Sequence, residues 1–187
     1  PIRSSGNQPF TTAAAGPNAL AVGSNANANG NSTTAVGENT NATGLRSSAI
    51  GTNALADKED SSALGANARA TDIGSTALGS NASASGLRSN AIGFSAVANK
   101  EDSSALGANA RATGIGSTAL GNSSDSRGLR SNALGANAFA DKEDSSALGA
   151  YARATGIGSN ALGSYAKASG LRSNAIGTNA RAVAEDS

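Results

Sequence analysis

The sequence predicts an all-β chain, a parallel β-roll (solenoid) of about twelve stacked turns, and three observations lead to that fold. A glycine recurs every 14 residues from Gly23 to Gly177 without a miss. Each of these glycines follows an Ala and then a Val, Ile or Leu, and Ala also dominates three and five residues after the glycine. Because a fixed short period is the signature of a solenoid, each 14-residue unit should form one turn of a rod.

The composition alone would also suit a disordered chain. Glycine accounts for 24 of the 187 residues, aromatic residues for 3%, and Cys, Met, Trp and His are absent. Such a chain lacks the large apolar side chains of an ordinary core. Twelve branched aliphatic residues in one register are not expected of a disordered tract, so the periodicity favours an ordered fold.

One period contains two short strands separated by turns. The segments Ser-x-Ala-Leu-Gly and Ala-x-Ala alternate with a period of two, as strands do. Gly, Asn, Ser, Thr and Asp lie between them and favour tight turns, whereas a helix is disfavoured because Gly or Asn interrupts every few residues. Each turn should add one strand to each of two parallel sheets, at about 4.8 Å per turn. We expect residues 1–15 to form an irregular capping segment, residues 16–182 the repeats, and residues 183–187 the start of a connector or simply the end of the chain.

The aliphatic residue before each recurring glycine, together with that glycine, forms the structural ladder of the predicted roll. The strand that carries the ladder has Ala on its other face, and only one of the two faces can look into the roll. A thin roll also buries little apolar area, and an aliphatic ladder on the outside would be a long exposed stripe. Side-by-side packing of identical rolls removes both difficulties, so a homo-oligomer is predicted. The ladder comprises Ile50, Gly51, Leu64, Gly65, Leu78, Gly79, Ile92, Gly93, Leu106, Gly107, Leu120, Gly121, Leu134, Gly135, Leu148, Gly149, Leu162, Gly163, Ile176 and Gly177.

A longer period of 42 residues, or three turns, lies over the first. The tripeptides Gly-Leu-Arg and Lys-Glu-Asp recur at this spacing and occupy equivalent places in consecutive turns. Stacking should bring their Arg and Asp residues about one strand spacing apart as surface ion pairs. The alternative of a metal site is disfavoured because these turns lack the Gly-x-Gly-x-Asp pattern of calcium-binding rolls, and no cofactor is expected. The predicted pairs are Arg46 with Asp60, Arg88 with Asp102, and Arg130 with Asp144.

The outer column, defined as the residues four positions after the recurring glycines, should face solvent on the second sheet. Its apolar members recur every three turns, and each is followed one turn later by an Arg. These residues are a candidate ligand-contact stripe, although duplication could also have copied neutral surface residues. The stripe comprises Leu55, Arg69, Val97, Arg111, Phe139 and Arg153.

The Asn column, defined as the residues two positions after the recurring glycines, holds Asn in eight of the twelve turns. Asn tolerates the left-handed backbone conformation and bonds to its own backbone, so a structural role in the turn is expected. Stacked Asn side chains could also form an amide ladder.

Repeated Ser-x-Ala-Ile-Gly followed by Ala-x-Ala at 14-residue spacing, over roughly Gly16 to Ala182, resembles the head domains of trimeric autotransporter adhesins, the YadA-like proteins of Gram-negative bacteria. The resemblance implies a left-handed parallel β-roll, a homotrimer about a threefold axis, and non-enzymatic attachment of bacteria to host extracellular matrix, including collagen in some members, or to host cells. It also implies display at the bacterial cell surface, on an outer-membrane anchor outside this sequence. The family motif Asn-Ser-Val-Ala-Ile-Gly-x-x-Ser is kept only in part, because its Val position holds polar residues such as Ser62, Thr76 and Asn90.

Other classes of function lack their sequence features. A net charge of +1 with interspersed signs argues against a nucleic-acid groove, and no apolar run approaches the ~20 residues that span a bilayer. No nucleophile–base pair or set of metal ligands points to an enzyme. A passive spacer rod is one alternative to the adhesin. An ice-binding or surface-binding solenoid is another, although it would need a regular rank of Thr that the mixed outer column lacks.

Overall fold

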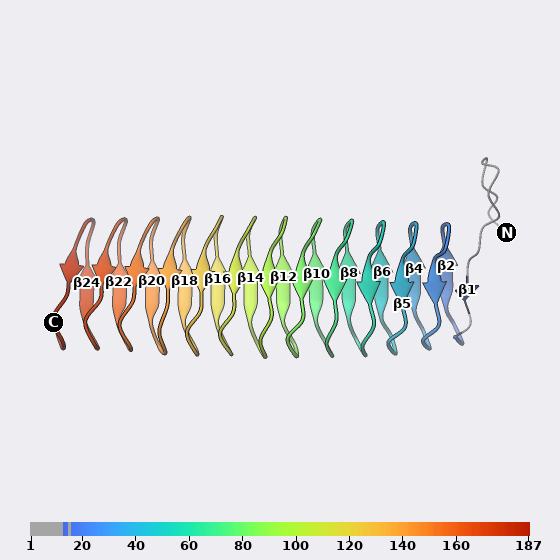
Figure 1. Ribbon diagram of the computed structural model, residues 1–187, viewed down its shortest axis with the longest axis horizontal. Helices are drawn as coiled ribbons and strands as arrows, with labels where there is room; N and C mark the ends of the chain where they lie inside the picture. The colour runs from blue at the N-terminus through green and yellow to red at the C-terminus, as the bar shows by residue number, and fades with distance from the viewer. Residues whose placement is uncertain (1–12, 15) are drawn as a thin grey trace.

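The computed structural model describes residues 13–14 and 16–187, which form a long rod of stacked turns with Ala13–Ala14 at one end and Ser187 at the other (Figure 1). The described residues contain no helix, and all of their strands lie in two parallel sheets that run the length of the rod. The all-β parallel β-roll predicted from the 14-residue period is therefore confirmed.

Each turn contributes a two-residue strand to one sheet, called sheet A, and a three-residue strand to the other, called sheet B. The strands of sheet A are β1 (Ala13–Ala14), β3 (Asn27–Ala28), β5 (Asn41–Ala42), β7 (Leu55–Ala56), β9 (Arg69–Ala70), β11 (Ser83–Ala84), β13 (Val97–Ala98), β15 (Arg111–Ala112), β17 (Asp125–Ser126), β19 (Phe139–Ala140), β21 (Arg153–Ala154), β23 (Lys167–Ala168) and β25 (Arg181–Ala182). The strands of sheet B are β2 (Leu20–Val22), β4 (Thr34–Val36), β6 (Ser48–Ile50), β8 (Ser62–Leu64), β10 (Thr76–Leu78), β12 (Asn90–Ile92), β14 (Ser104–Leu106), β16 (Thr118–Leu120), β18 (Asn132–Leu134), β20 (Ser146–Leu148), β22 (Asn160–Leu162) and β24 (Asn174–Ile176).

The two ends of the repeat array differ in how the structure describes them. The expected capping segment, residues 1–15, lies outside the described residues except for β1, which pairs with β3. At the other end, residues 183–187 follow the path of the preceding turns. Arg172 Nε donates a hydrogen bond to Asp186 Oδ1 at 2.6 Å, and the backbone N–H of Asn174 donates to the carbonyl of Ser187 at 2.5 Å.

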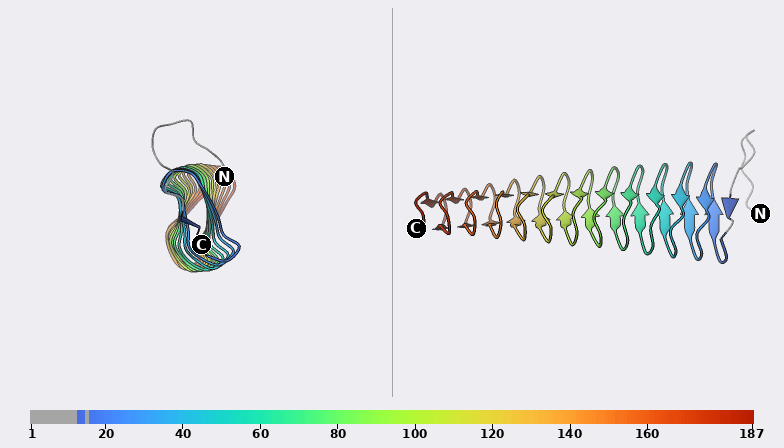
Figure 2. Two further views of the ribbon diagram at one scale, coloured as in Figure 1. Left: turned by 90° about the vertical axis from the view of Figure 1, so that its right-hand side faces the viewer. Right: turned by 60° about the horizontal axis from the view of Figure 1, so that its bottom comes forward.

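The register between turns stays constant along the rod. In β8 and β10, for example, Ala63 pairs with Ala77 and Leu64 pairs with Leu78, a shift of 14 residues. Because no pairing slips, every position of the repeat forms a column parallel to the rod axis. The end-on view of Figure 2 shows these turns superimposed with a small progressive twist.

The recurring glycine is required by its backbone angle and by the closeness of the next turn. Gly51 has φ of +129°, and a Cβ atom added to it would lie 2.5 Å from the carbonyl oxygen of Gly65. Only glycine avoids both penalties. Two residues later, the Asn column adopts the left-handed conformation, as at Asn53 with φ of +57°. Asn53 Nδ2 also donates to Asn67 Oδ1 at 3.2 Å, so the expected contact between stacked amides is present there.

The interior of the roll is built from Ala and Ser. The Ala columns two residues before the recurring glycine, and three and five residues after it, are almost fully buried. The Ser four residues before the glycine is buried as well, and in most turns its hydroxyl donates to the carbonyl three residues earlier in the same tight turn. Ser61 Oγ donates to the Lys58 carbonyl at 2.7 Å, and Ser103 Oγ donates to the Lys100 carbonyl at 2.6 Å. The recurring Ser therefore closes a turn in a space that excludes larger side chains.

The aliphatic ladder lies on the outer face of sheet B. In β8 and β10 the side chains of Ala63 and Ala77 are fully buried, whereas Leu64 and Leu78 keep 37% and 43% of their surface exposed. The sequence left open which face of this strand looks inward, and the structure assigns the interior to Ala. The two sheets approach closely enough for Ala, so a branched side chain has no room between them.

Candidate functional site

The six residues of the predicted contact stripe lie in the outer column, on the outer face of sheet A. Their exposure differs, because Arg69, Arg111 and Arg153 are exposed and the three apolar members are half-buried. Strand pairing places each apolar residue beside its Arg: Leu55 beside Arg69, Val97 beside Arg111, and Phe139 beside Arg153.

The third of these pairs differs from the other two because it is aromatic. The Phe139 ring lies between two guanidinium groups, with the Arg127 Cζ atom 4.9 Å and the Arg153 Cζ atom 4.8 Å from the ring centroid. Arg127 in turn donates from Nε to Asp125 Oδ2 at 2.9 Å. A cation over an aromatic face is attracted by the ring quadrupole, so the two arginines hold the ring between them.

Two tyrosines lie next to this cluster, in the Asn column. Tyr151 and Tyr165 occupy consecutive turns, and their rings are parallel to within 4° with centroids 4.9 Å apart. Both adopt the left-handed conformation, with φ of +59° and +60°. The other turns place Asn or Ser there, and a bulky residue in this conformation is an outlier.

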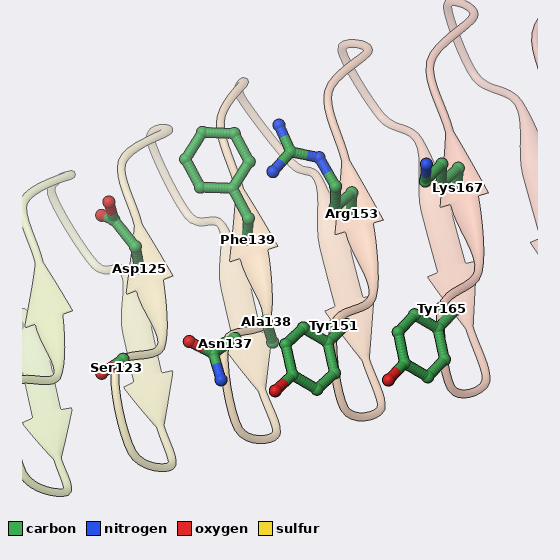
Figure 3. Close-up of a pocket in the computed structure, with 9 residues that line it drawn as sticks. All are labelled: Ser123, Asp125, Asn137, Ala138, Phe139, Tyr151, Arg153, Tyr165 and Lys167. Atoms are coloured by element: carbon green, nitrogen blue, oxygen red, sulfur yellow. The ribbon is translucent and has the colours of Figure 1, made fainter.

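The tyrosines and the Phe139 cluster line a shallow groove of about 460 Å³ that follows the rod axis (Figure 3). One side is the Asn column and the other is the outer column, as Figure 3 shows. The lining residues are Ser123, Asn137, Tyr151 and Tyr165 on the first side, Asp125, Phe139, Arg153 and Lys167 on the second, and Ala138 between them.

Sequence reasoning identified Phe139 and Arg153 but missed the two tyrosines. A signal was present, because two of the five aromatic residues in the chain replace Asn in consecutive repeats. The Asn column was interpreted from the Asn that fills most of its positions, so its two tyrosines were not recognised as candidates. The contact of Phe139 with Arg127 could not be read from the repeat, because the two residues occupy different columns.

The predicted Arg and Asp residues meet in the structure. Arg46 donates from Nε to Asp60 Oδ1 at 2.7 Å and from Nη2 to Asp60 Oδ2 at 2.7 Å, and Nη2 also donates to Glu59 at 2.7 Å. The hydrogen bonds from Arg46 lower the pKa of the Asp60 carboxyl below its usual value of 3.8, and the same contacts raise the pKa of Arg46.

Equivalent hydrogen bonds join Arg88 to Asp102 and Arg130 to Asp144. A further pair, Arg172 with Asp186, was not predicted. The side chains in these pairs are about half-exposed, which makes each pair a weak contributor to stability.

Within residues 13–14 and 16–187 no three His, Cys, Asp or Glu side chains lie close enough together to hold a metal ion. The same residues contain no helix of the length and apolarity needed to cross a membrane.

Comparisons with known proteins point to one family. The family model described as "YadA head domain repeat (2 copies)" matches residues 14–40, 28–54, 56–82, 84–110, 98–124, 112–131, 126–152, 154–180 and 168–187. A solved structure, the collagen-binding domain of the Yersinia adhesin YadA, is similar with a TM-score of 0.46 and 25% identity. The match covers 78% of this chain and 66% of that one, so this chain spans just under two thirds of the YadA domain. A comparison with curated protein sequences found no match. Since the family matches run along nearly the whole roll, the chain belongs to the YadA head-repeat family.

Proposed function

We propose that the chain is the adhesive head of a bacterial surface protein, a non-enzymatic rod that attaches to host extracellular matrix or host cells. The observation that carries this proposal is the difference between the two outer faces of the roll. Sheet B presents a uniform aliphatic ladder, whereas sheet A presents a mixed column of apolar, aromatic and charged side chains. A uniform apolar face suits contact with identical copies, and a varied face suits recognition of something else.

The assembly that fits the ladder is a homotrimer. The ladder runs over ten of the twelve strands of sheet B, from β6 to β24, and its exposed members range from 37% at Leu64 to 73% at Ile176. A contiguous apolar stripe of this length is unusual on a soluble monomer. Identical rolls have the same turn spacing, so their ladders can interdigitate turn by turn. The YadA-like family supplies the number three, with the three ladders around a common axis.

Matrix attachment through sheet A is the second part of the proposal. In such a trimer the outer column lies on the sheet opposite the ladder, where a ligand can reach it. Collagen is the first ligand to test because the resemblance to YadA-like heads implies matrix binding. The polar residues at the Val position of the family motif, such as Ser62 and Thr76, leave the choice among matrix proteins to experiment.

The experiment measures binding of the purified assembly to immobilised collagen, other matrix proteins and cultured host cells. The test variant replaces Leu55, Val97 and Phe139 together with Ser, and we expect it to bind less while its mass and melting temperature stay unchanged. Unchanged binding would contradict the stripe. Failure of the unmodified assembly to bind any of these targets would favour a passive spacer.

A further inference from the structure

We propose that the groove between the Asn column and the outer column, built around Tyr151, Tyr165 and Arg153, binds an acidic linear oligosaccharide along the rod axis. This deepens the adhesive function proposed above and rests on it. Within the described residues, the Asn column departs from small polar side chains only at Tyr151 and Tyr165.

The two tyrosines occupy a backbone position that disfavours them. Left-handed φ angles suit Asn and Gly, and a bulky side chain in this conformation strains the backbone. Burial of these rings stabilises the fold little, since Tyr151 and Tyr165 keep 46% and 50% of their surface exposed. Locally strained residues cluster where a protein contacts a ligand. The stacked rings cover part of each other, and the surface that stays exposed is available to a ligand.

The chemistry of the tyrosines suits a sugar. Each ring is a flat apolar surface that ends in a hydroxyl group able to donate and accept hydrogen bonds. A pyranose ring has an apolar face of C–H bonds and a rim of hydroxyl groups, which complement such a side chain. Because the two rings are parallel and lie in consecutive turns, the same sugar-binding surface is repeated along the rod, as Figure 3 shows.

The charge beside the tyrosines suits an acidic ligand. Arg153, Lys167 and Arg181 follow one another in the outer column, and within the described residues none of them forms an ion pair. The carboxylate that shares the groove, Asp125, is already engaged by Arg127. The groove therefore presents uncompensated positive charge, which favours carboxylate or sulfate groups on the ligand.

The backbone around the groove disfavours a peptide strand as the ligand. The N–H of Phe139 donates to the Ala152 carbonyl at 2.9 Å, and the N–H of Arg153 donates to the Ala166 carbonyl at 2.8 Å. The N–H of Tyr151 likewise donates to the Ala136 carbonyl at 2.9 Å. Because these groups bond to adjacent turns, the groove offers no free strand edge for β-augmentation. Hydroxyl, amide and guanidinium groups of side chains remain, and these suit a polyhydroxylated ligand.

The shape of the groove suits a linear polymer. Its two sides are columns of the solenoid, so equivalent contacts recur at the turn spacing of about 4.8 Å. A chain of sugar residues lying parallel to the rod would meet the tyrosines on one side and the cations on the other. Tyr151, Tyr165, Arg153 and Lys167 would then contact successive sugar units.

The test is titration calorimetry of the purified full chain, in its native assembly, with three oligosaccharides. Hyaluronan fragments carry carboxylates alone, heparin fragments carry sulfates and carboxylates, and dextran fragments are neutral. We expect one or both acidic ligands to bind and dextran not to bind. The double variant Y151N/Y165N should weaken that binding by about tenfold or more, the size expected for loss of two aromatic contacts. Its melting temperature should stay the same or rise, because Asn is the usual residue at both positions.

A matched pair of arginine variants distinguishes specific binding in the groove from nonspecific electrostatic attraction to the rod. Arg153 and Arg111 hold the same place in the three-turn block and lose the same charge on substitution, but only Arg153 lies beside the tyrosines. R153A should weaken binding severalfold more than R111A. Equal losses, equal binding of dextran, or no binding of either acidic ligand would overturn the proposal. Tyrosine-dependent binding of a collagen peptide without binding of any acidic sugar would assign the groove to protein instead. The adhesion assay measures binding to matrix proteins and cells, whereas the calorimetry measures binding of isolated sugars, so failure of the adhesive function and failure of the sugar site remain distinguishable.

Discussion

Arg88 and Asp102, one turn apart, are joined by two parallel hydrogen bonds, from Nε to Oδ1 at 2.7 Å and from Nη2 to Oδ2 at 2.8 Å. The Nη2 atom also donates to Glu101 at 2.9 Å. An equivalent fork joins each Gly-Leu-Arg turn to the Glu-Asp pair of the turn that follows it, so the three-turn repeat of the sequence appears as a periodic cross-link on the surface of the rod.

These pairs predict a loss of stability in acid. Hydrogen bonds from the arginines lower the pKa of Asp60, Asp102 and Asp144 in the folded chain below the usual 3.8. A lowered folded pKa means that the stabilisation is complete above the unfolded value and is lost as pH falls through the folded value. The melting temperature should therefore hold steady from neutral pH to about pH 5 and fall below about pH 4.

The triple variant D60N/D102N/D144N isolates this effect. Asn also tolerates the left-handed conformation of these positions, so the turns should remain intact. Its melting temperature should depend less on pH below about pH 4 than that of the unmodified chain, and added salt should narrow the difference. Parallel pH profiles for the two proteins would contradict the assignment.

A glycine-to-alanine comparison tests the close approach of adjacent turns. Gly93 has φ of +133°, and a Cβ atom there would lie 2.4 Å from the Gly107 carbonyl oxygen. Gly177 has φ of +117° but no atom within 4 Å of such a Cβ. G177A should cost about 1–2 kcal/mol from the backbone angle alone, and G93A about 3 kcal/mol or more. Denaturant unfolding measures the stability of both variants. Equal losses of stability would show that the next turn of the solenoid can move away to accommodate the added Cβ atom.

Overpacking of the interior should be costly despite the small size of the residues involved. Ala105 is fully buried in β14 between the two sheets, so A105V forces them apart and should destabilise the chain by about 1–3 kcal/mol. Ala108, in the tight turn directly after β14, is only half-buried, and A108V should change stability by less than about 0.5 kcal/mol. Thermal unfolding of the two variants checks the difference, and a neutral A105V would show that the roll can expand.

Charge in the aliphatic ladder should break the assembly. In the variant L78E/L106E/L134E, three glutamates replace residues on the outer face of sheet B, where apposed copies would bring like charges together without water. Sedimentation should then give the 17.9 kDa of one chain, whereas the unmodified protein should give about three times that mass. V97E on sheet A is the control and should leave the mass unchanged. A monomeric unmodified protein would contradict the packing argument.

The stacking of the turns could be predicted in detail because the repeat has one length throughout. Once the glycines recur at a constant interval, residues such as Leu64 and Leu78 must be neighbours, and so must Arg46 and Asp60. Whether the ladder faces the interior or the outside of the roll could not be predicted in the same way. The residues Ala63 and Leu64 are both apolar, so the alternation that normally identifies the inner face of a strand does not distinguish them.

The sequence by itself determined the solenoid, its register, the two strands of each turn and the Arg–Asp cross-links, because each follows from a position repeated at constant spacing. Only the tertiary structure decided that Ala fills the interior and the ladder lies outside, since this depends on the distance between the sheets. It also decided that Tyr151, Tyr165 and Phe139 line one groove, as Figure 3 shows. Tyr151 and Tyr165 lie in the tight turns before β21 and β23, whereas Phe139 lies in the strand β19, so the path of the backbone from turn to strand sets how close the two columns come.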